Sequence, residues 1–199
     1  MAILIACSID SFKEEKKVIA IQTLNGFPNN LTDTVKKAIE EYYHFKTVVY
    51  EDCKIPKDFY VTIKSPRYRA DSIIRYLRTN KPDSINHIIG LTKVDISVTK
   101  YDKNGAIKSP TSKYKDWGIF GLGFRPGVSC VVSSYRLKHT SQQKYIDRLK
   151  KVSLHELGHN LGLPHCPGRN CFMRDAAETI KTIDSVELNL CQKCYNKVQ

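Results

Sequence analysis

Three histidines and a glutamate stand at fixed intervals near the C-terminal end of this chain. The run reads His155-Glu156-x-x-His159-x-x-Gly162-x-x-His165. On a helix, His155 and His159 lie one turn apart on the same face, so their imidazoles can hold one zinc ion. Glu156 would lie beside that ion without binding it. Gly162 permits a sharp turn that brings His165 round as a third ligand.

Three protein ligands leave one tetrahedral position for water, which is the arrangement of a catalytic zinc site. Zinc lowers the pKa of that water toward about 7 and polarises a carbonyl group of the substrate. Glu156 could accept the proton as general base and pass it to the leaving amine. The pattern therefore predicts hydrolysis of peptide bonds. The alternatives are a zinc site without hydrolytic activity and an ordinary helix that happens to carry His-Glu-x-x-His, although the glycine and the third histidine argue against the latter.

Four cysteines follow the third histidine with paired spacing. They are Cys166, Cys171, Cys191 and Cys194. Four thiolates suit a closed, structural zinc site, and Cys191-x-x-Cys194 could present two of them from one helical turn. Because Cys166 directly follows His165, the two metal sites would share a backbone segment. Four unconnected buried cysteines and a disulfide pair are the alternatives.

The composition is that of an ordinary globular protein. The chain has 199 residues, 41% of them hydrophobic, which suits one domain. No apolar run reaches the roughly 18–20 residues of a membrane-spanning helix. The N-terminal segment Ala2–Ser8 has no basic leader, so we interpret it as a core strand and not as a signal peptide. We therefore expect a cytoplasmic protein, in which Cys7, Cys53 and Cys130 are small buried residues.

The chain carries a formal net charge of +12. A basic surface could attract nucleic acid, a membrane or acidic substrates. The lysines are scattered and form no compact basic and aromatic motif, so we do not expect nucleic acid as the main partner. We expect a peptide or protein substrate and no membrane, and the oligomeric state stays open. A non-catalytic, zinc-stabilised binding module with a basic surface is the alternative function, but it has no need of Glu156 beside an open zinc site.

Alternating strands and helices must position these residues. Apolar and β-branched runs predict strands over Ala2–Ser8, Lys17–Thr23, Thr47–Tyr50, within Asn86–Ser97, and over Ile119–Phe124 and Val128–Ser134. The polar, lysine-rich stretch Ser97–Trp117 contains Asn104-Gly105 and Ser109-Pro110. These dipeptides are typical of turns, so we interpret the stretch as a hairpin or mobile loop.

Helical spacing of apolar residues predicts the helices. They cover Leu31–Phe45, Pro66–Arg78, about Ser141 to Leu161, and a last helix from about Asp184. Thr32 or Asp33 could cap the first of these. The third carries the first two histidines and should end at Gly162. Asp184 with Glu187 resembles a capping box at the start of the last helix.

The motif residues resemble those of the archaemetzincin family of metzincin zinc peptidases. That family follows its histidine motif with a cysteine, four residues, Cys-x-Met, seventeen residues and Cys-x-x-Cys. Cys166, Cys171, Met173, Cys191 and Cys194 keep this spacing. The likeness is strong over about forty residues and looser upstream.

The resemblance implies a zincin-like α/β (α+β) fold, with a twisted mixed sheet, an active-site helix and a small cysteine-zinc C-terminal lobe. One catalytic domain would span residues 1–199, with an upper lobe over about 1–163 and a lower lobe over about 164–199. Met173 would belong to a Met-turn beneath the catalytic zinc. Ile119–Phe124 would be the edge strand to which a peptide substrate adds. The implied activity is that of a zinc metallopeptidase with two zinc ions per chain, and aminopeptidase-like cleavage of small peptides is one description of the family.

Overall fold

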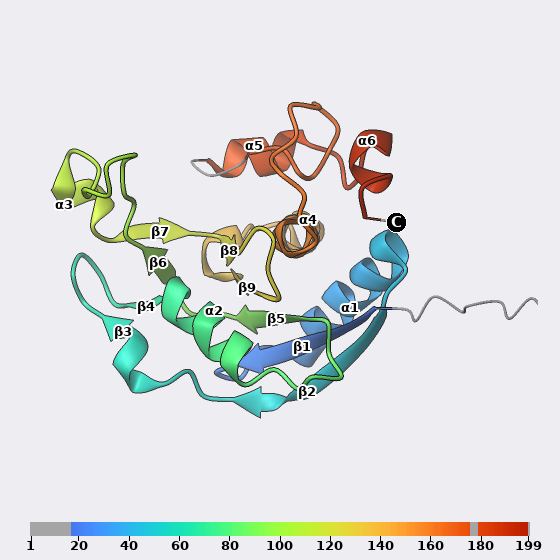
Figure 1. Ribbon diagram of the computed structural model, residues 1–199, viewed down its shortest axis with the longest axis horizontal. Coiled ribbons are helices and arrows are strands. Elements are labelled where there is room, and N and C mark those ends of the chain that lie inside the picture. The colour runs from blue at the N-terminus through green and yellow to red at the C-terminus, as the bar shows by residue number, and fades with distance from the viewer. Residues whose placement is uncertain (1–16, 176–178, 199) are drawn as a thin grey trace, which may run out of the picture.

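The structure is a computed structural model that describes residues 17–175 and 179–198 (Figure 1). Two mixed sheets and the helices packed on them make up this part of the chain. The α/β fold class predicted from the sequence is therefore confirmed. The predicted strand Ala2–Ser8, which contains Cys7, lies outside the described residues.

The first sheet has five strands in the order β2-β1-β5-β9-β8. Their bounds are Lys46–Cys53, Val18–Leu24, His87–Thr92, Ser129–Ser133 and Gly121–Gly123. The first four strands are parallel, and β8 pairs with β9 in the antiparallel direction. Alternate residues of β1 face opposite sides, so Ile19 and Ile21 join one core cluster while Ala20 and Leu24 join the other. Burial on both faces explains why β1, β5 and β9 have nearly continuous apolar sequences.

The second sheet is smaller and has the order β3-β4-β6-β7. Its strands are Tyr60–Val61, Arg67–Arg69, Ile96–Val98 and Trp117–Ile119. The predicted single strand Ile119–Phe124 was wrong in one respect, because the chain changes sheet within it. β7 ends at Ile119, the carbonyl of Phe120 accepts a hydrogen bond from the Ser133 amide at 2.8 Å, and β8 begins at Gly121.

The lysine-rich stretch between β6 and β7 forms a hairpin, which is one of the two interpretations drawn from the sequence. Tyr101 and Ile107 make an antiparallel bridge. The Asp102 carboxylate closes the turn by accepting hydrogen bonds from the amides of Asn104 and Ala106 at 2.9 and 3.0 Å. A short helix, α3 (Thr111–Tyr114), which the sequence did not predict, follows before β7.

Helices cover both faces of the large sheet. α1 (Asn29–Tyr43) and α4 (Gln142–Asn160) pack on one face, and α2 (Ala70–Thr79) packs on the other (Figure 1). The predicted caps of α1 were wrong. Pro28 precedes its first turn, and Thr32 is buried inside the helix with its hydroxyl donating to the Pro28 carbonyl at 3.1 Å.

The predicted start of α2 was also wrong. The helix begins at Ala70, because the preceding residues form β4. The Arg67 guanidinium lies 2.8 Å from the Asp95 carboxylate and 3.1 Å from that of Asp116. Both carboxylates are buried, with 8% and 0% of their side chains exposed. These ion pairs hold Arg67 in the small sheet, and they cannot be read from helical spacing.

The C-terminal part lies on the other side of α4 from the sheet and contains two short helices, α5 (Ile180–Ser185) and α6 (Gln192–Tyr195) (Figure 1). The predicted capping box at Asp184 was wrong. Asp184 lies near the end of α5 and not before a helix, and its carboxylate pairs with Arg148 of α4 at 2.7 Å. Ser141 caps α4, with its hydroxyl accepting from the Lys144 amide at 3.4 Å.

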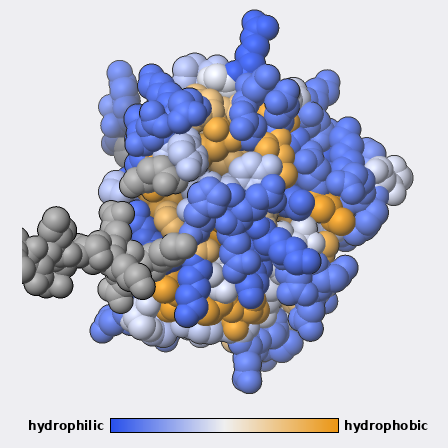
Figure 2. All heavy atoms as spheres, turned by 90° about the vertical axis from the view of Figure 1, so that its right-hand side faces the viewer, coloured by the Kyte–Doolittle hydropathy of each residue, from blue (hydrophilic) through white to orange (hydrophobic). Residues whose placement is uncertain are grey.

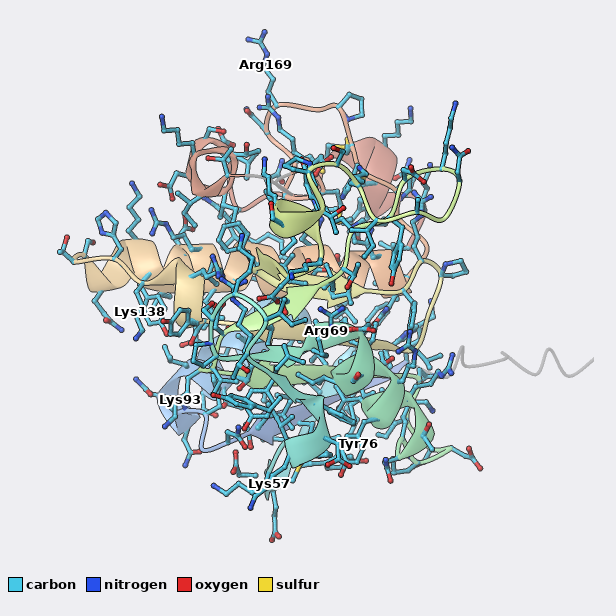
Figure 3. The ribbon with its side chains drawn as sticks, turned by 90° about the vertical axis from the view of Figure 1, so that its left-hand side faces the viewer. Lys57, Arg69, Tyr76, Lys93, Lys138 and Arg169 are labelled. Atoms are coloured by element: carbon cyan, nitrogen blue, oxygen red, sulfur yellow. The ribbon has the colours of Figure 1, made fainter. Side chains whose placement is uncertain are left out.

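The surface is mainly hydrophilic, with smaller hydrophobic areas on the face that Figure 2 shows. Lys57, Lys93, Lys138 and Arg169 extend into solvent from separate parts of the chain (Figure 3). The positive charge is therefore scattered, as the sequence suggested. Among the described residues, no helix is both long enough and apolar enough to cross a membrane.

Candidate metal centres and active site

Three imidazoles converge at the end of α4. The rings of His155 and His159 have centroids 4.6 Å apart, as their spacing on one helical face predicts. Gly162, with φ of 92°, makes the turn that ends the helix. His165 then returns to lie 4.9 Å from the His159 ring and 5.3 Å from the His155 ring. One nitrogen from each ring lies within 4.8 Å of the others, so the three could hold one metal ion.

Backbone carbonyls orient two of these rings. Nδ1 of His155 lies 2.7 Å from the Phe172 carbonyl, and Nδ1 of His159 lies 2.8 Å from the Leu163 carbonyl. Each Nδ1 must therefore carry a proton, which leaves Nε2 with a lone pair for a metal. Burial, and then the neighbouring His159, lower the pKa of His155 to about 3. Burial also lowers the pKa of His159, so both rings are in the neutral form that binds metals.

Glu156 is buried against the edge strand β8, with 8% exposure. Burial raises the pKa of its carboxyl to about 8. A Cβ added at Gly121 would lie 2.6 Å from Glu156 Cγ, and one added at Gly123 would lie 2.7 Å from the Glu156 carbonyl oxygen. Sequence reasoning missed these two glycines. The signal that could have found them is a Gly-x-Gly pair inside a strand, which marks a close approach of another part of the chain.

Met173 is fully buried and packs against α4 at Gly158. A Cβ added at Gly158 of α4 would lie 2.5 Å from Met173 Sδ and 2.8 Å from the Tyr43 hydroxyl. Only a glycine lets the helix come so close to both side chains. The Tyr43 hydroxyl also donates to the Leu154 carbonyl at 2.8 Å, so α1 holds the turn of α4 that precedes His155.

The four C-terminal cysteines form a second cluster. Their sulfur atoms lie within 4.8 Å of one another, and Sγ of Cys166 lies 3.7 Å from Sγ of Cys191. Two sulfurs bound to one tetrahedral zinc at about 2.3 Å would be about 3.8 Å apart, so the spacing fits this metal. None of the cysteines in the described part of the chain forms a disulfide. Cys130 is buried as expected, whereas Cys53 is partly exposed.

A cavity of about 260 Å³ joins the histidines to the elements around them. The edge strand β8 forms one wall, and α4 contributes Val152, His155, Glu156 and His159. The opposite side comes from the C-terminal part, through Phe172, Arg174, Ile183 and Val186. The cavity therefore lies where three separate segments of the chain meet.

A mixed sheet whose antiparallel edge strand borders three convergent imidazoles and a buried glutamate is the arrangement of a zinc metallopeptidase. The sequence pattern of peptidase family M54 matches residues 15–199, and the chain belongs to that family. It is therefore a zinc metallopeptidase, as the sequence predicted.

Several curated relatives are archaemetzincins. The chain is 28% identical over 171 residues to the archaemetzincin of Methanopyrus kandleri. The match covers 86% of this chain and 87% of that protein. It is 27% identical over 189 residues to the archaemetzincin of Halobacterium salinarum, and the match covers 90% of this chain and 98% of that protein. The predicted resemblance to this family is thereby confirmed.

Solved structures agree with the fold. The crystal structure of the Methanopyrus kandleri archaemetzincin has a TM-score of 0.75 and 27% identity, and the match covers 94% of this chain and 96% of that one. The archaemetzincin of Archaeoglobus fulgidus, crystallised with malonate, has a TM-score of 0.71 and 24% identity, and the match covers 90% of this chain and 99% of that one. The likeness to this second structure supports the fold alone.

Proposed function

We propose that the protein hydrolyses peptide bonds in peptides or proteins, with His155, His159 and His165 as ligands of a catalytic zinc ion and Glu156 as general base. The observation that carries the proposal is the convergence of the three imidazoles beside a buried carboxyl group in one cavity. A bound zinc ion supplies Lewis acidity, which lowers the pKa of a water molecule toward about 7 and polarises a carbonyl group. The protein residues supply the remaining steps.

In this proposal Glu156 moves the proton. Its carboxylate would accept a proton from the attacking water and then donate it to the nitrogen of the leaving amine. Burial supports this role, because a carboxyl group with a pKa of about 8 is a far better base than one in water. A pure binding module would gain nothing from a carboxyl group buried at this cost beside an open metal site.

The edge strand β8 would hold the substrate. In the described part of the chain β8 pairs with β9 along one side. An extended peptide could therefore add along its other side by main-chain hydrogen bonds, with the scissile carbonyl above the histidines. Aminopeptidase-like action on small peptides is the finer form of this proposal. Acetylation of the substrate N-terminus would then abolish cleavage, whereas an endopeptidase would tolerate it.

The four cysteines would hold a second, structural zinc ion, which makes two zinc ions per chain. Their sulfur spacing and burial support a closed site. The whole chain would then act as one catalytic domain, with an upper lobe over about 1–163 and a lower lobe over about 164–199 that the second ion stabilises. The cytoplasmic location expected from the sequence stays a prediction, which cell fractionation would check.

The sharpest test replaces Glu156 with glutamine, which keeps the shape and removes the base. We expect Glu156→Gln to lose peptide hydrolysis by at least about a hundredfold and to keep the zinc content of the unaltered protein. Glu187→Gln is the matched control, because Glu187 is an exposed glutamate that does not line the cavity. Cleavage of a peptide library, analysed by mass spectrometry, is the measurement. Full activity in Glu156→Gln would remove this residue from the mechanism.

A further inference from the structure

A buried lysine lines the same cavity as the three histidines. Lys151 precedes His155 by one helical turn of α4, and its side chain is only 7% exposed. Four helical residues span about 6 Å, so Lys151 lies roughly one side-chain length from the metal ligand. The proposed mechanism gives this residue no role. A lysine is rarely buried to this extent unless its charge has a partner.

The contacts of Lys151 use two of its three N–H donors. Its ammonium group lies 2.5 Å from the Asp147 carboxylate and 3.3 Å from the Ile183 carbonyl. Asp147 is 36% exposed, whereas Lys151 is 7% exposed. Water therefore screens the carboxylate more effectively than the ammonium group. Lys151 lines the cavity, whereas Asp147 does not.

A second cation lines the cavity. Arg174 follows the buried Met173 and is partly buried itself. Within the described part of the chain, its guanidinium makes no hydrogen bond or ion pair. Lys100 is a third cation in the lining, which also includes the acidic residues Glu156 and Asp175. The three cations outnumber these two carboxyl groups, and each offers N–H donors to a carboxylate.

Apolar side chains also line the cavity. Val152, Phe172, Ile183 and Val186 line the cavity together with Lys151. Methylene groups would pack on such walls while a polar end reached the ammonium group. A glutamate side chain has this combination, since it carries two methylene groups and ends in a carboxylate. Glutamine has the same shape without the charge.

We propose that the cavity is a specificity pocket for a glutamate side chain next to the scissile bond, with Lys151 as its specificity-determining residue. This inference rests on the proposed peptidase function, because it names the substrate class of that same site. Neutral side chains of the same length lose the charge-assisted hydrogen bond, and a lysine side chain meets repulsion.

The test uses the zinc-loaded full chain and a set of otherwise identical peptides. Glutamate, glutamine, methionine or lysine is placed at one position, first directly before and then directly after the scissile bond. We expect kcat/KM for glutamate to exceed that for glutamine by about tenfold or more at one of these positions. Equal cleavage of both peptides at both positions would overturn the inference and leave the peptidase function intact.

Variants assign the preference to one residue. Lys151→Met should abolish the preference for glutamate, and Lys151→Arg should retain it. Lys150→Met is the matched control, because it removes a positive charge from the neighbouring position of α4, which does not line the cavity. A preference that survives in Lys151→Met would show that Lys151 does not set it. Thermal unfolding of each variant separates loss of preference from loss of fold.

A binding measurement keeps the two proposals separable. The same peptides, labelled with a fluorophore, are titrated into Glu156→Gln protein and followed by anisotropy. Tighter binding of the glutamate peptide, lost in the double variant with Lys151→Met, would support the pocket even if the unaltered protein cleaved nothing. Equal affinities for the glutamate and glutamine peptides would overturn the pocket whatever the outcome for hydrolysis.

Discussion

Glu156 lies against the backbone of β8 at two glycines. Burial raises its pKa, and the absent side chains of Gly121 and Gly123 leave the space that its carboxyl group occupies. The proposed role of Glu156 as base therefore depends on residues that bear no functional group themselves. The position of the Glu156 carboxyl group is therefore set both by its own side chain and by the missing Cβ atoms of Gly121 and Gly123.

Gly121→Ala should reduce peptide hydrolysis by about a hundredfold or more, because its Cβ would lie 2.6 Å from Glu156 Cγ and push the carboxyl group away. The control is Gly105→Ala at the hairpin tip, where φ is +81° and nothing lies within 4 Å. That change should cost about 1 kcal/mol of stability through backbone strain and leave hydrolysis unaffected. Activity and thermal unfolding are measured for both variants. Normal activity in Gly121→Ala would mean that the function of Glu156 does not depend on a glycine at position 121.

At the scale of elements, the ion pair between α4 and α5 joins the active-site helix to the C-terminal part. The Arg148 guanidinium is 7% exposed and lies 2.7 Å from each oxygen of the Asp184 carboxylate. Arg148 also donates to the carbonyls of Leu137 and Lys138 at 3.1 Å. A bidentate, partly buried pair of this kind fixes geometry as well as charge. It therefore sets where α5, which lines the cavity, lies relative to the histidines.

This pair should make stability fall in acid. The hydrogen bond from Arg148 is the largest cause that lowers the pKa of Asp184, from 3.8 to about 2. A carboxyl group with a lowered folded-state pKa stabilises the fold above its unfolded pKa, and the contribution is lost as the pH falls from about 4 to 2. With 22% of the side chain exposed, solvent screening limits the effect to about 1–2 kcal/mol.

Asp184→Asn is the variant that tests this contribution. We expect it to lose about 1–3 kcal/mol at pH 7, because Arg148 stays buried without its counter-charge. Its stability should also depend less on pH between 4 and 2 than that of the unaltered protein. Asp83→Asn, at an exposed position, is the control. Denaturant unfolding at each pH is the measurement, and parallel pH curves for the unaltered protein and Asp184→Asn would contradict the prediction.

The elements that the sequence predicted well are those with a strong local signal. α4 was predicted from about Ser141 to Leu161 and spans Gln142–Asn160, and Gly162 follows its end with a positive φ that glycine adopts readily. The errors arise where contacts between distant residues decide the local structure. Arg67 belongs to β4 because it pairs with Asp95 and Asp116, which come later in the chain. Asp184 pairs with Arg148 of α4 and does not cap a helix.

The candidate site shows the same division. Spacing alone was enough to bring together the histidines and, separately, the cysteines. The pocket around them was not predictable, because Lys151 of α4 and Ile183 of α5 come into contact only through tertiary packing. Ligand spacing is a local property of the chain, whereas pocket walls depend on tertiary packing. Reaction class could therefore be predicted from the sequence, whereas a proposal about substrate preference required the fold.

At the scale of the whole molecule, the two candidate metal sites lie in series along one segment. His165 belongs to the first cluster and Cys166 to the second, and the Cys166 amide donates to the Met173 carbonyl at 2.8 Å. The two clusters differ in exposure. His165 is 45% exposed, whereas Cys166, Cys171 and Cys194 are buried. Loss of metal from the two sites should therefore have different consequences.

We expect a chelator to remove zinc in two steps. The three-histidine site has an exposed ligand and an open position, so it should lose its ion first, and hydrolysis should stop while the fold persists. Removal of the second ion from the four cysteines should then unfold the C-terminal part, because a closed zinc site contributes folding energy directly. Elemental analysis, peptide cleavage and circular dichroism are followed together during the titration.

Matched variants separate the two sites. His159→Ala should bind one zinc ion per chain and keep near-normal stability, whereas Cys194→Ser should lose stability, the second ion and hydrolysis together, because the segment that holds His165 loosens. Cys194 belongs to α6 and Cys166 to the segment that follows His165, so loss of an ion bound to both should release these two segments from each other. A protein that binds one zinc ion in its unaltered form, or a Cys194→Ser variant with unchanged unfolding temperature and activity, would refute the two-ion arrangement.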